Sequence, residues 1–254
     1  MGSAGGDYLR GLKTVASCEL LVVSCELKLP ACFAGDSIIF LDAESIAALL
    51  QPYTALTAVP ASPAFPDFSA PDWPRIYAQL SIYLGLILKW NARINLTAIR
   101  TPEEIVRRHF GESLFAGLRL GACQTLLDFG SGAGFPGLPI QLLRPDVAVT
   151  VAESRSKKAA FLHEVTRSLD LPAEVWAGRV EAMPPSRRFD TVTLRAVDNM
   201  EAALGETGRR ASQRILILGS SRTSLPPELA EQFPVREQAA LPQTADGVLF
   251  ELRR

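Results

Sequence analysis

The spacing of apolar residues predicts helices in the first part of the chain. The apolar residues that share one face of the longest predicted helix are Ile76, Leu80, Leu84, Ile87 and Leu88. A shorter helix is predicted at 42–50, where Asp42 can cap the first turn. Another is predicted to begin at Thr101, because Pro102 suits the first turn and Glu104 completes a capping box.

From residue 125 the pattern changes to short, continuous apolar runs. The runs predicted to be strands are 125–129, 147–153, 173–177, 189–194 and 214–219. The helical segments predicted between them are 137–143, 156–169 and 200–211. This alternation is typical of a parallel sheet that is covered by helices on both faces.

The C-terminal segment differs from the alternating part. After a predicted helix at 226–233, the segments 234–241 and 247–254 read as two strands joined by a short turn-rich stretch. They predict a terminal antiparallel pair. The whole pattern therefore predicts an α/β fold with a Rossmann-like, seven-stranded, mostly parallel sheet and an N-terminal helical extension.

Three regions are expected along the chain. Residues 1–34 read as a loose N-terminal extension, 35–118 as a helical region, and 119–254 as the Rossmann-like domain. Within the helical region, the proline-rich stretch 59–74 is predicted to be a loop or linker.

Composition and charge narrow the classes of function. The chain has 254 residues, 48% of them hydrophobic and 21% charged, with a net charge of −1. These values are ordinary for a globular protein, and any contact with nucleic acid must use a local basic patch. The apolar runs are too short to span a membrane, so we expect a cytoplasmic protein without membrane association. Cys18, Cys25 and Cys32 lie seven residues apart with no nearby histidine, which is not a zinc pattern, so we expect no metal. In a cytoplasmic protein we expect the thiols to be reduced.

A glycine-rich segment, LLDFGSGAGFPGLPI (126–140), lies between the first predicted strand and the next helix. Ligands of such sheets bind beyond the carboxyl ends of the strands, beside the first strand. Glycine lets the backbone approach a ligand closely. The dinucleotide fingerprint fits only when it is counted from Gly132, which is late relative to the strand. The pattern acid-x-G-x-G-x-G, led by Asp128 and including Gly130, is instead typical of S-adenosylmethionine sites.

Two further segments support that ligand. Glu153 ends the second strand, at the spacing where a carboxylate accepts hydrogen bonds from ribose hydroxyls. After the third strand, Val180 is placed to pack on an adenine ring, and Glu181 or its amide to meet the exocyclic amine. A simple strand-to-helix turn is the alternative for the glycines, and a solvated loop acid is the alternative for Glu181.

Four segments carry a resemblance to a known family. They are KWNARINLTAIRTPEEIVRRHFGESL (89–114), LLDFGSGAGFPGLPIQLLRP (126–145), GRVEAM (178–183) and FDTVTLRAV (189–197). Together they resemble the RsmG family, also called glucose-inhibited division protein B. The resemblance implies a class I S-adenosylmethionine-dependent methyltransferase that methylates guanine N7 in 16S ribosomal RNA, in the free RNA or the small subunit.

The resemblance also implies site residues. It implies cofactor contacts at Gly130, Phe135, Val180, Glu181 and Arg195. Arg195 follows the fourth strand, where the methyl acceptor should approach, so we expect it to position the substrate. An ion pair with Glu181 or Asp198 is the structural alternative for this arginine.

RNA is expected to be held through phosphate contacts. The candidates are Arg93, Arg100, Arg107, Arg108 and His109 in the helical region and Arg155, Lys157 and Lys158 after the second strand, with Arg100, Arg108, His109, Lys157 and Lys158 favoured. His163, Trp90 and Cys123 are expected to be ordinary packing or helix residues. We expect the protein to be a monomer.

The chain departs from the family pattern at two positions. Leu218 stands where the family commonly has lysine, which suggests the loss of a charge facing RNA, and Glu112 stands for the acid of R-H-x-x-D-S. Two other functions stay open: a methyltransferase of a small molecule or protein, and a non-catalytic module that binds the cofactor or RNA.

Overall fold

The computed structural model describes residues 41–55, 70–197 and 200–254. The expected extension at 1–34 and residues 59–69 of the proline-rich stretch lie outside the described residues. Two residues of that stretch are helical rather than part of a linker, since the helix α2 (Trp73–Asn91) begins with Trp73 and Pro74. Asp72 caps it through a side-chain oxygen that accepts a hydrogen bond from the Arg75 amide, and proline suits a first turn.

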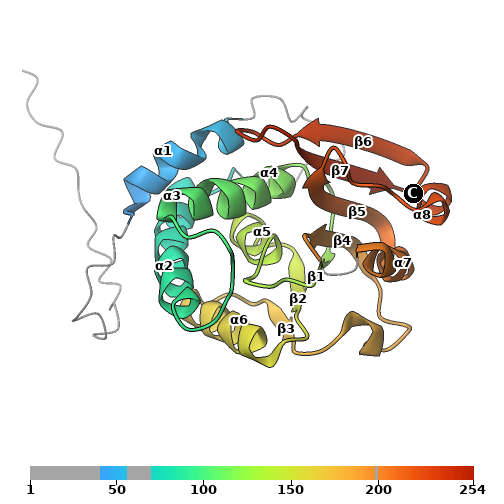
Figure 1. Ribbon diagram of the computed structural model, residues 1–254, viewed down its shortest axis with the longest axis horizontal. Helices are drawn as coiled ribbons and strands as arrows, with labels where there is room; N and C mark the ends of the chain where they lie inside the picture. The colour runs from blue at the N-terminus through green and yellow to red at the C-terminus, as the bar shows by residue number, and fades with distance from the viewer. Residues whose placement is uncertain (1–40, 56–69, 198–199) are drawn as a thin grey trace, which may run out of the picture. The chain divides into compact units, whose positions relative to one another are not determined.

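The sheet has seven strands in the order β3-β2-β1-β4-β5-β7-β6 (Figure 1). The strands are β1 (Thr125–Phe129), β2 (Ala148–Ala152), β3 (Glu174–Trp176), β4 (Phe189–Arg195), β5 (Ala211–Ser220), β6 (Val235–Ala240) and β7 (Gly247–Arg253). The first five are parallel, and β7 pairs antiparallel with both β5 and β6. The predicted sheet and its antiparallel end are confirmed.

Helices cover both faces of this sheet. They are α1 (Ala43–Thr54), α2, α3 (Pro102–Glu104), α4 (Glu112–Leu118), α5 (Gly137–Leu143), α6 (Ser156–Ser168), α7 (Met200–Arg210) and α8 (Pro227–Gln232). Two further helical segments are the π-helical η1 (Ile105–Gly111) and the 3-10 turn η2 (Val180–Ala182). The helix predicted to begin at Thr101 is therefore interrupted by π-helical turns, a feature that often marks functional positions.

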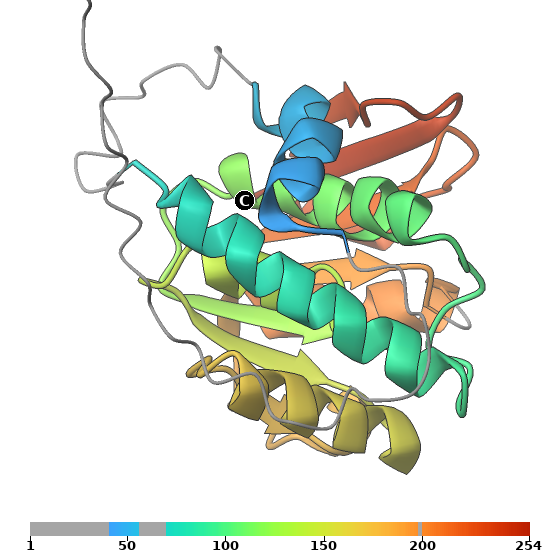
Figure 2. The same ribbon diagram turned by 90° about the vertical axis from the view of Figure 1, so that its left-hand side faces the viewer.

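Side chains of successive strand residues enter two separate hydrophobic cores. Leu126 packs with α2, α4, α5 and α6 on one face, whereas Leu127 packs with α7 and α8 on the other. In β5, Leu216 and Ile217 divide in the same way, because neighbouring strand residues point to opposite faces. Figure 2 faces the first layer and shows α2 running across it, with α1 and α4 on one side and α6 on the other.

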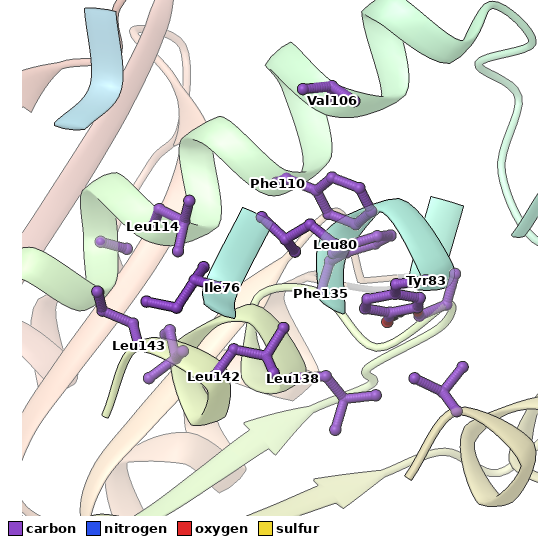
Figure 3. Close-up of a cluster of buried hydrophobic side chains, with 14 of the residues drawn as sticks. Ile76, Leu80, Tyr83, Val106, Phe110, Leu114, Phe135, Leu138, Leu142 and Leu143 are labelled. Carbon is purple, nitrogen blue, oxygen red and sulfur yellow. Dashed lines mark hydrogen bonds between the residues drawn. The ribbon is translucent and has the colours of Figure 1, made fainter. Parts of the chain in front are cut away.

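The helices before residue 119 share the first core with the sheet. Tyr83 of α2 stacks on Phe135, which follows β1, with 5.6 Å between ring centroids. Phe110 of η1 lies against the same two rings, as Figure 3 shows. The described residues, 41–55, 70–197 and 200–254, belong to one compact unit, and the expected division at residue 118 falls within it, where the secondary structure changes.

Candidate functional site

A cavity of about 610 Å³ lies beyond the carboxyl ends of β1, β2 and β4. Its wall consists of the glycine-rich loop after β1, the turns after β2, β3 and β4, and three residues from the N-terminal helical region. These three residues are Leu96, Thr97 and His109. Of the cofactor residues expected from the sequence, those that line the cavity are Gly130, Gly132, Phe135, Glu153, Val180, Glu181 and Arg195.

Asp128 does not line this cavity. Its side chain is fully buried beneath the loop, where Oδ2 accepts a hydrogen bond from the Gly137 amide at 3.0 Å and Oδ1 accepts one from the Thr193 hydroxyl at 2.9 Å. Burial raises the pKa of the Asp128 carboxyl to about 6, and the hydrogen bonds oppose that shift. The structure therefore places Asp128 beneath the cavity wall, where it joins β1, β4 and the start of α5, and a contact of its carboxylate with the cofactor stays a prediction.

The glycine-rich loop rests directly on α2. The Tyr83 hydroxyl donates a hydrogen bond to the Ala133 carbonyl, with 2.5 Å between the oxygens. Gly134 has a φ of +90°, and a Cβ built there would lie 2.2 Å from the Tyr83 hydroxyl. Only glycine suits this backbone conformation at such close approach. The N-terminal helical region thus fixes the backbone conformation of the glycine-rich loop through Tyr83.

Glu153 holds two turns of the cavity wall together. Its Oε2 accepts a hydrogen bond from the Gly132 amide at 3.0 Å, and its Oε1 accepts one from the Arg155 amide at 2.7 Å. The side chain is mostly buried and still lines the cavity. Each carboxylate oxygen can accept more than one hydrogen bond, so the group can also bind hydroxyls of a ligand.

The turn after β3 is anchored by a buried arginine that sequence reasoning missed. The Arg210 guanidinium donates to the carbonyls of Val180 and Met183, at 3.2 and 3.1 Å, and forms an ion pair with Glu206. This anchoring places Val180, which is buried, and Glu181, which is exposed, in the cavity wall. Two adjacent arginines at the end of a predicted helix gave no signal that one of them is buried in this role.

Arg195 makes several hydrogen bonds in the cavity wall. Its Nη2 donates to the Arg108 carbonyl at 2.9 Å and to Glu112 Oε2 at 3.0 Å, and its Nη1 bonds to His109 Nδ1. Burial lowers the pKa of the guanidinium, and the Glu112 carboxylate opposes that change. The ion-pair partner is thus Glu112 rather than Glu181, and Asp198 lies outside the described residues.

Glu112 is the acid that departs from the family motif. Its side chain is 3% exposed, and it also forms an ion pair with Arg108 at 2.7 Å. It lies one helical turn after His109, so both side chains of the motif reach the same guanidinium. Glutamate at position 112 therefore still supplies the carboxylate that pairs with Arg195.

His109 lies flat on Phe135, with 4.6 Å between ring centroids and 20° between the planes. Burial lowers the pKa of its imidazole to about 2, with further lowering by Arg195 and Arg108. Its Nε2 lies 2.7 Å from the Thr97 hydroxyl. A neutral ring with both nitrogens engaged does not suit the phosphate contact that the sequence suggested for His109.

The segment that carries Thr97 is shaped by Asn91. The Asn91 carboxamide oxygen accepts hydrogen bonds from the amides of Leu96 and Thr97, at 2.9 and 3.2 Å, and its nitrogen donates to the Thr97 carbonyl at 3.1 Å. These bonds turn the chain back at the end of α2 and bring Leu96 and Thr97 into the cavity wall. The W-N-x-x-x-N-L-T pattern of the sequence was the signal, but its spacing alone did not show what the asparagine does.

The expected RNA-binding residues fall into two groups. Lys158 and Arg155 line the cavity together with Arg179. The side chains outside the cavity wall are Arg93, Arg100, Arg107, Arg108 and Lys157. Within the second group, Arg108 is half-exposed and Arg100 donates to Asn95 at 3.3 Å. The cations of the first group therefore belong to the cavity wall.

The expectation that Leu218 marks a lost charge facing RNA is wrong, because this side chain is buried. Leu218 is 3% exposed and belongs to the hydrophobic core beside β7, so the substitution changes the core and not the surface. Trp90 packs edge-on against Phe161, as expected. Cys123 is half-buried, and its thiol donates to the Thr125 carbonyl, which agrees with a packing role.

The described residues offer neither a metal site nor a membrane-spanning helix. Within the ranges 41–55, 70–197 and 200–254, no group of three or more histidine, cysteine or acidic side chains is arranged to hold a metal ion. In the same ranges, no helix combines the length and the apolar character that crossing a membrane requires.

The strand order, the antiparallel β7 and the cavity beyond β1, β2 and β4 define a Rossmann-like class I methyltransferase fold. A family model described as "rRNA small subunit methyltransferase G" matches residues 76–221, more than half of the chain. The chain therefore belongs to the rRNA small subunit methyltransferase G family, as the sequence motifs indicated.

Known relatives agree with this assignment. A protein of Nitrosomonas europaea named "Ribosomal RNA small subunit methyltransferase G" is 43% identical over 139 residues, which is 54% of this chain and 64% of the relative. A protein of the same name from Xanthomonas euvesicatoria is 38% identical over 166 residues, which is 65% of this chain and 74% of the relative. Among solved structures, a putative O-methyltransferase from Klebsiella pneumoniae has 16% identity and a TM-score of 0.47, over 68% of this chain and 90% of that one.

Proposed function

We propose that this protein transfers a methyl group from S-adenosylmethionine to N7 of a guanine in 16S ribosomal RNA, acting as a monomer on the RNA or the small subunit. The observation that carries the proposal is the cavity that unites the glycine-rich loop, Glu153, Val180 and Arg195 in a member of this family.

The lining of the cavity fits the proposed cofactor. Glu153 presents a carboxylate that can accept hydrogen bonds from ribose hydroxyls, and Val180 offers an apolar surface for adenine. A Cβ built on Gly132 would have no protein atom closer than 3.9 Å, so the missing side chain leaves space on the cavity side of the loop. S-adenosylmethionine supplies a methyl group already activated by its sulfonium. In this proposal Asp128 acts indirectly, by supporting the loop from below.

The remaining chemistry needs positioning rather than proton transfer. Guanine N7 carries a free lone pair, so its methylation requires no general base. His109 could not act as one, because both ring nitrogens are engaged and the pKa is about 2. Arg195 orients the acceptor, and its bonds to Glu112 and the Arg108 carbonyl keep the guanidinium in place before the substrate arrives.

RNA phosphates are proposed to meet the basic side chains near the cavity. Arg155, Lys158 and Arg179 line it, and Lys157 lies on the same helix as Lys158. Arg100 and Arg108 lie outside the cavity wall, in the N-terminal segments that supply Thr97 and His109 to it. Such contacts fix the register of the RNA and leave the choice of base to groups inside the cavity.

The experiment is methylation of 16S ribosomal RNA taken from a strain that lacks this gene. Purified protein and S-adenosylmethionine labelled in the methyl group are incubated with naked RNA or with small subunits, and the modified base is mapped by mass spectrometry. Formation of 7-methylguanosine at one position supports the proposal. Cofactor binding without turnover on either substrate would refute it and indicate a non-catalytic module.

A further inference from the structure

The hydrogen bonds around His109 fix the position of its proton. Arg195 Nη1 carries only donor hydrogens, so His109 Nδ1 must accept in the bond between them. A neutral imidazole that accepts at Nδ1 carries its hydrogen at Nε2. His109 therefore donates from Nε2 to the Thr97 hydroxyl oxygen, 2.7 Å away.

The same reasoning fixes the role of the Thr97 hydroxyl. Its oxygen also accepts a hydrogen bond from the Ile99 amide at 3.2 Å. A hydroxyl has two acceptor lone pairs and one hydrogen, so these two bonds use its acceptor capacity. Within the described part of the chain no group accepts the hydroxyl hydrogen, and Thr97 lines the cavity. Thr97 is thus held as a hydrogen-bond donor in the cavity wall.

The location of Thr97 matches the acceptor end of the cavity. The strand order places Glu153 and Val180 on the side of β2 and β3, and Arg195 on the side of β4. Thr97 is joined to Arg195 through a single imidazole ring. N7 and position 6 lie on the same edge of a purine, so a base that brings N7 to the transferred methyl group also brings position 6 into this part of the cavity.

We propose that the Thr97 hydroxyl donates a hydrogen bond to O6 of the acceptor guanine and thereby selects guanine against adenine. Guanine presents the acceptor O6 at this position, whereas adenine presents the donor N6 amine, which a donor in the wall opposes. The inference deepens the proposed methylation of guanine and rests on it. Thr97 is a specificity-determining residue here, and His109 is a positioning residue that keeps the hydroxyl in its donor role.

The test compares an acceptor with and without O6. The methylated guanine is first mapped with the wild-type protein, and RNA carrying 2-aminopurine at that one position is then prepared by ligation. The base 2-aminopurine retains N7 but has hydrogen at position 6. The ratio of kcat/KM for the guanine and 2-aminopurine substrates is measured for the wild type, Thr97→Val, Thr97→Ala and Thr97→Ser. RNA with inosine, which retains O6, is the substrate control.

Removing the hydroxyl should lower the guanine to 2-aminopurine ratio about tenfold, the effect expected of one lost hydrogen bond. Thr97→Ser should keep the wild-type ratio, and inosine should follow guanine in every variant. Loss of the bond from His109 alone would slow both substrates equally and leave the ratio unchanged. Thr54→Val is the matched control, because that hydroxyl bonds within α1 to the Leu50 carbonyl.

An unchanged ratio in a folded Thr97→Val or Thr97→Ala protein would overturn the inference while the proposed function stands. Failure of the wild type to methylate unsubstituted RNA would instead refute the proposed function, and the inference with it. Circular dichroism establishes which variants fold, and the alanine variant decides the question if the valine variant does not.

Discussion

The Glu112 carboxylate and the Arg195 guanidinium meet in a buried ion pair, with 3.0 Å between Oε2 and Nη2 and 83 positions between them in the chain. Glu112 begins α4, and Arg195 ends β4. The pair therefore joins the N-terminal helices to the carboxyl edge of the sheet at the wall of the cavity. In the proposed function, an arginine fixed in this way would orient the acceptor without losing side-chain freedom on binding.

Replacement of Glu112 by glutamine should lower the free energy of unfolding by about 2–3 kcal/mol. The side chain remains an acceptor, but Arg195 then stays charged and buried without its counterion. Urea unfolding measures the change. The control is Glu164→Gln, whose ion pair with Arg167 is exposed and should contribute less than about 1 kcal/mol. Equal losses in the free energy of unfolding for the two variants would show that the buried ion pair stabilises the fold no more than the exposed one.

His109 should make the stability depend on pH. Its pKa is about 2 in the folded chain and near 6.5 when unfolded, so only the unfolded chain takes up this proton between those values. Unfolding is then favoured as the pH falls below 6.5, by about 2 kcal/mol between pH 7.5 and 5. Asp128 acts oppositely, since its pKa is raised to about 6 and the folded chain binds that proton more tightly below this pH.

The difference between wild type and His109→Asn isolates the histidine. The variant should lose less stability than the wild type, by about 2 kcal/mol, when urea unfolding at pH 7.5 is compared with pH 5. Phe161→Leu removes a buried ring that packs on Tyr83 and Trp90 rather than on the imidazole, and it removes no titrating group, so it should keep the pH dependence of the wild type. Parallel pH profiles for wild type and His109→Asn would contradict the neutral, buried imidazole.

Replacement of Glu153 by alanine should weaken S-adenosylmethionine binding by about 1–3 kcal/mol, because ribose hydroxyls lose their acceptor. Calorimetry measures the affinity, and Glu174→Ala on β3, outside the cavity wall, is the control. A cofactor analogue without the 2′ and 3′ hydroxyls separates the direct contact from support of the loop. If the wild type and the variant lose affinity for this analogue to the same degree, the ribose assignment is wrong.

Two glycine-to-alanine substitutions should change stability in opposite directions. Gly134→Ala places a Cβ 2.2 Å from the Tyr83 hydroxyl at a φ of +90°, so it should cost at least about 2 kcal/mol. Gly205→Ala meets no atom within 4 Å in α7 and should stabilise by about 0.4–1 kcal/mol. Thermal unfolding measures both. The double variant Tyr83→Phe/Gly134→Ala should recover part of the loss, and no recovery would show that the hydroxyl is not the obstacle.

Much of the fold was predictable because its signals are local. The strand 125–129 and the helix 137–143 were predicted with the bounds that β1 and α5 have, since continuous apolar runs and the intervening glycines mark both ends. The terminal antiparallel pair followed from its turn residues. The π-helical turns of η1, whose Phe110 packs against Tyr83 and Phe135, were not predicted, because no sequence pattern distinguishes them from an α-helix.

The sequence by itself determined the succession of strands and helices along the chain, the glycine-rich loop and the acid after β2. These features depend on neighbouring residues and on the regular alternation of strand, loop and helix that parallel sheets share. Only the tertiary structure decided that Asp128 supports the loop from below and that Glu112, His109 and Thr97 form one hydrogen-bonded wall with Arg195. The physical reason is that burial and the direction of each hydrogen bond arise from groups distant in the chain, and these set the charge of the imidazole and the donor role of the threonine.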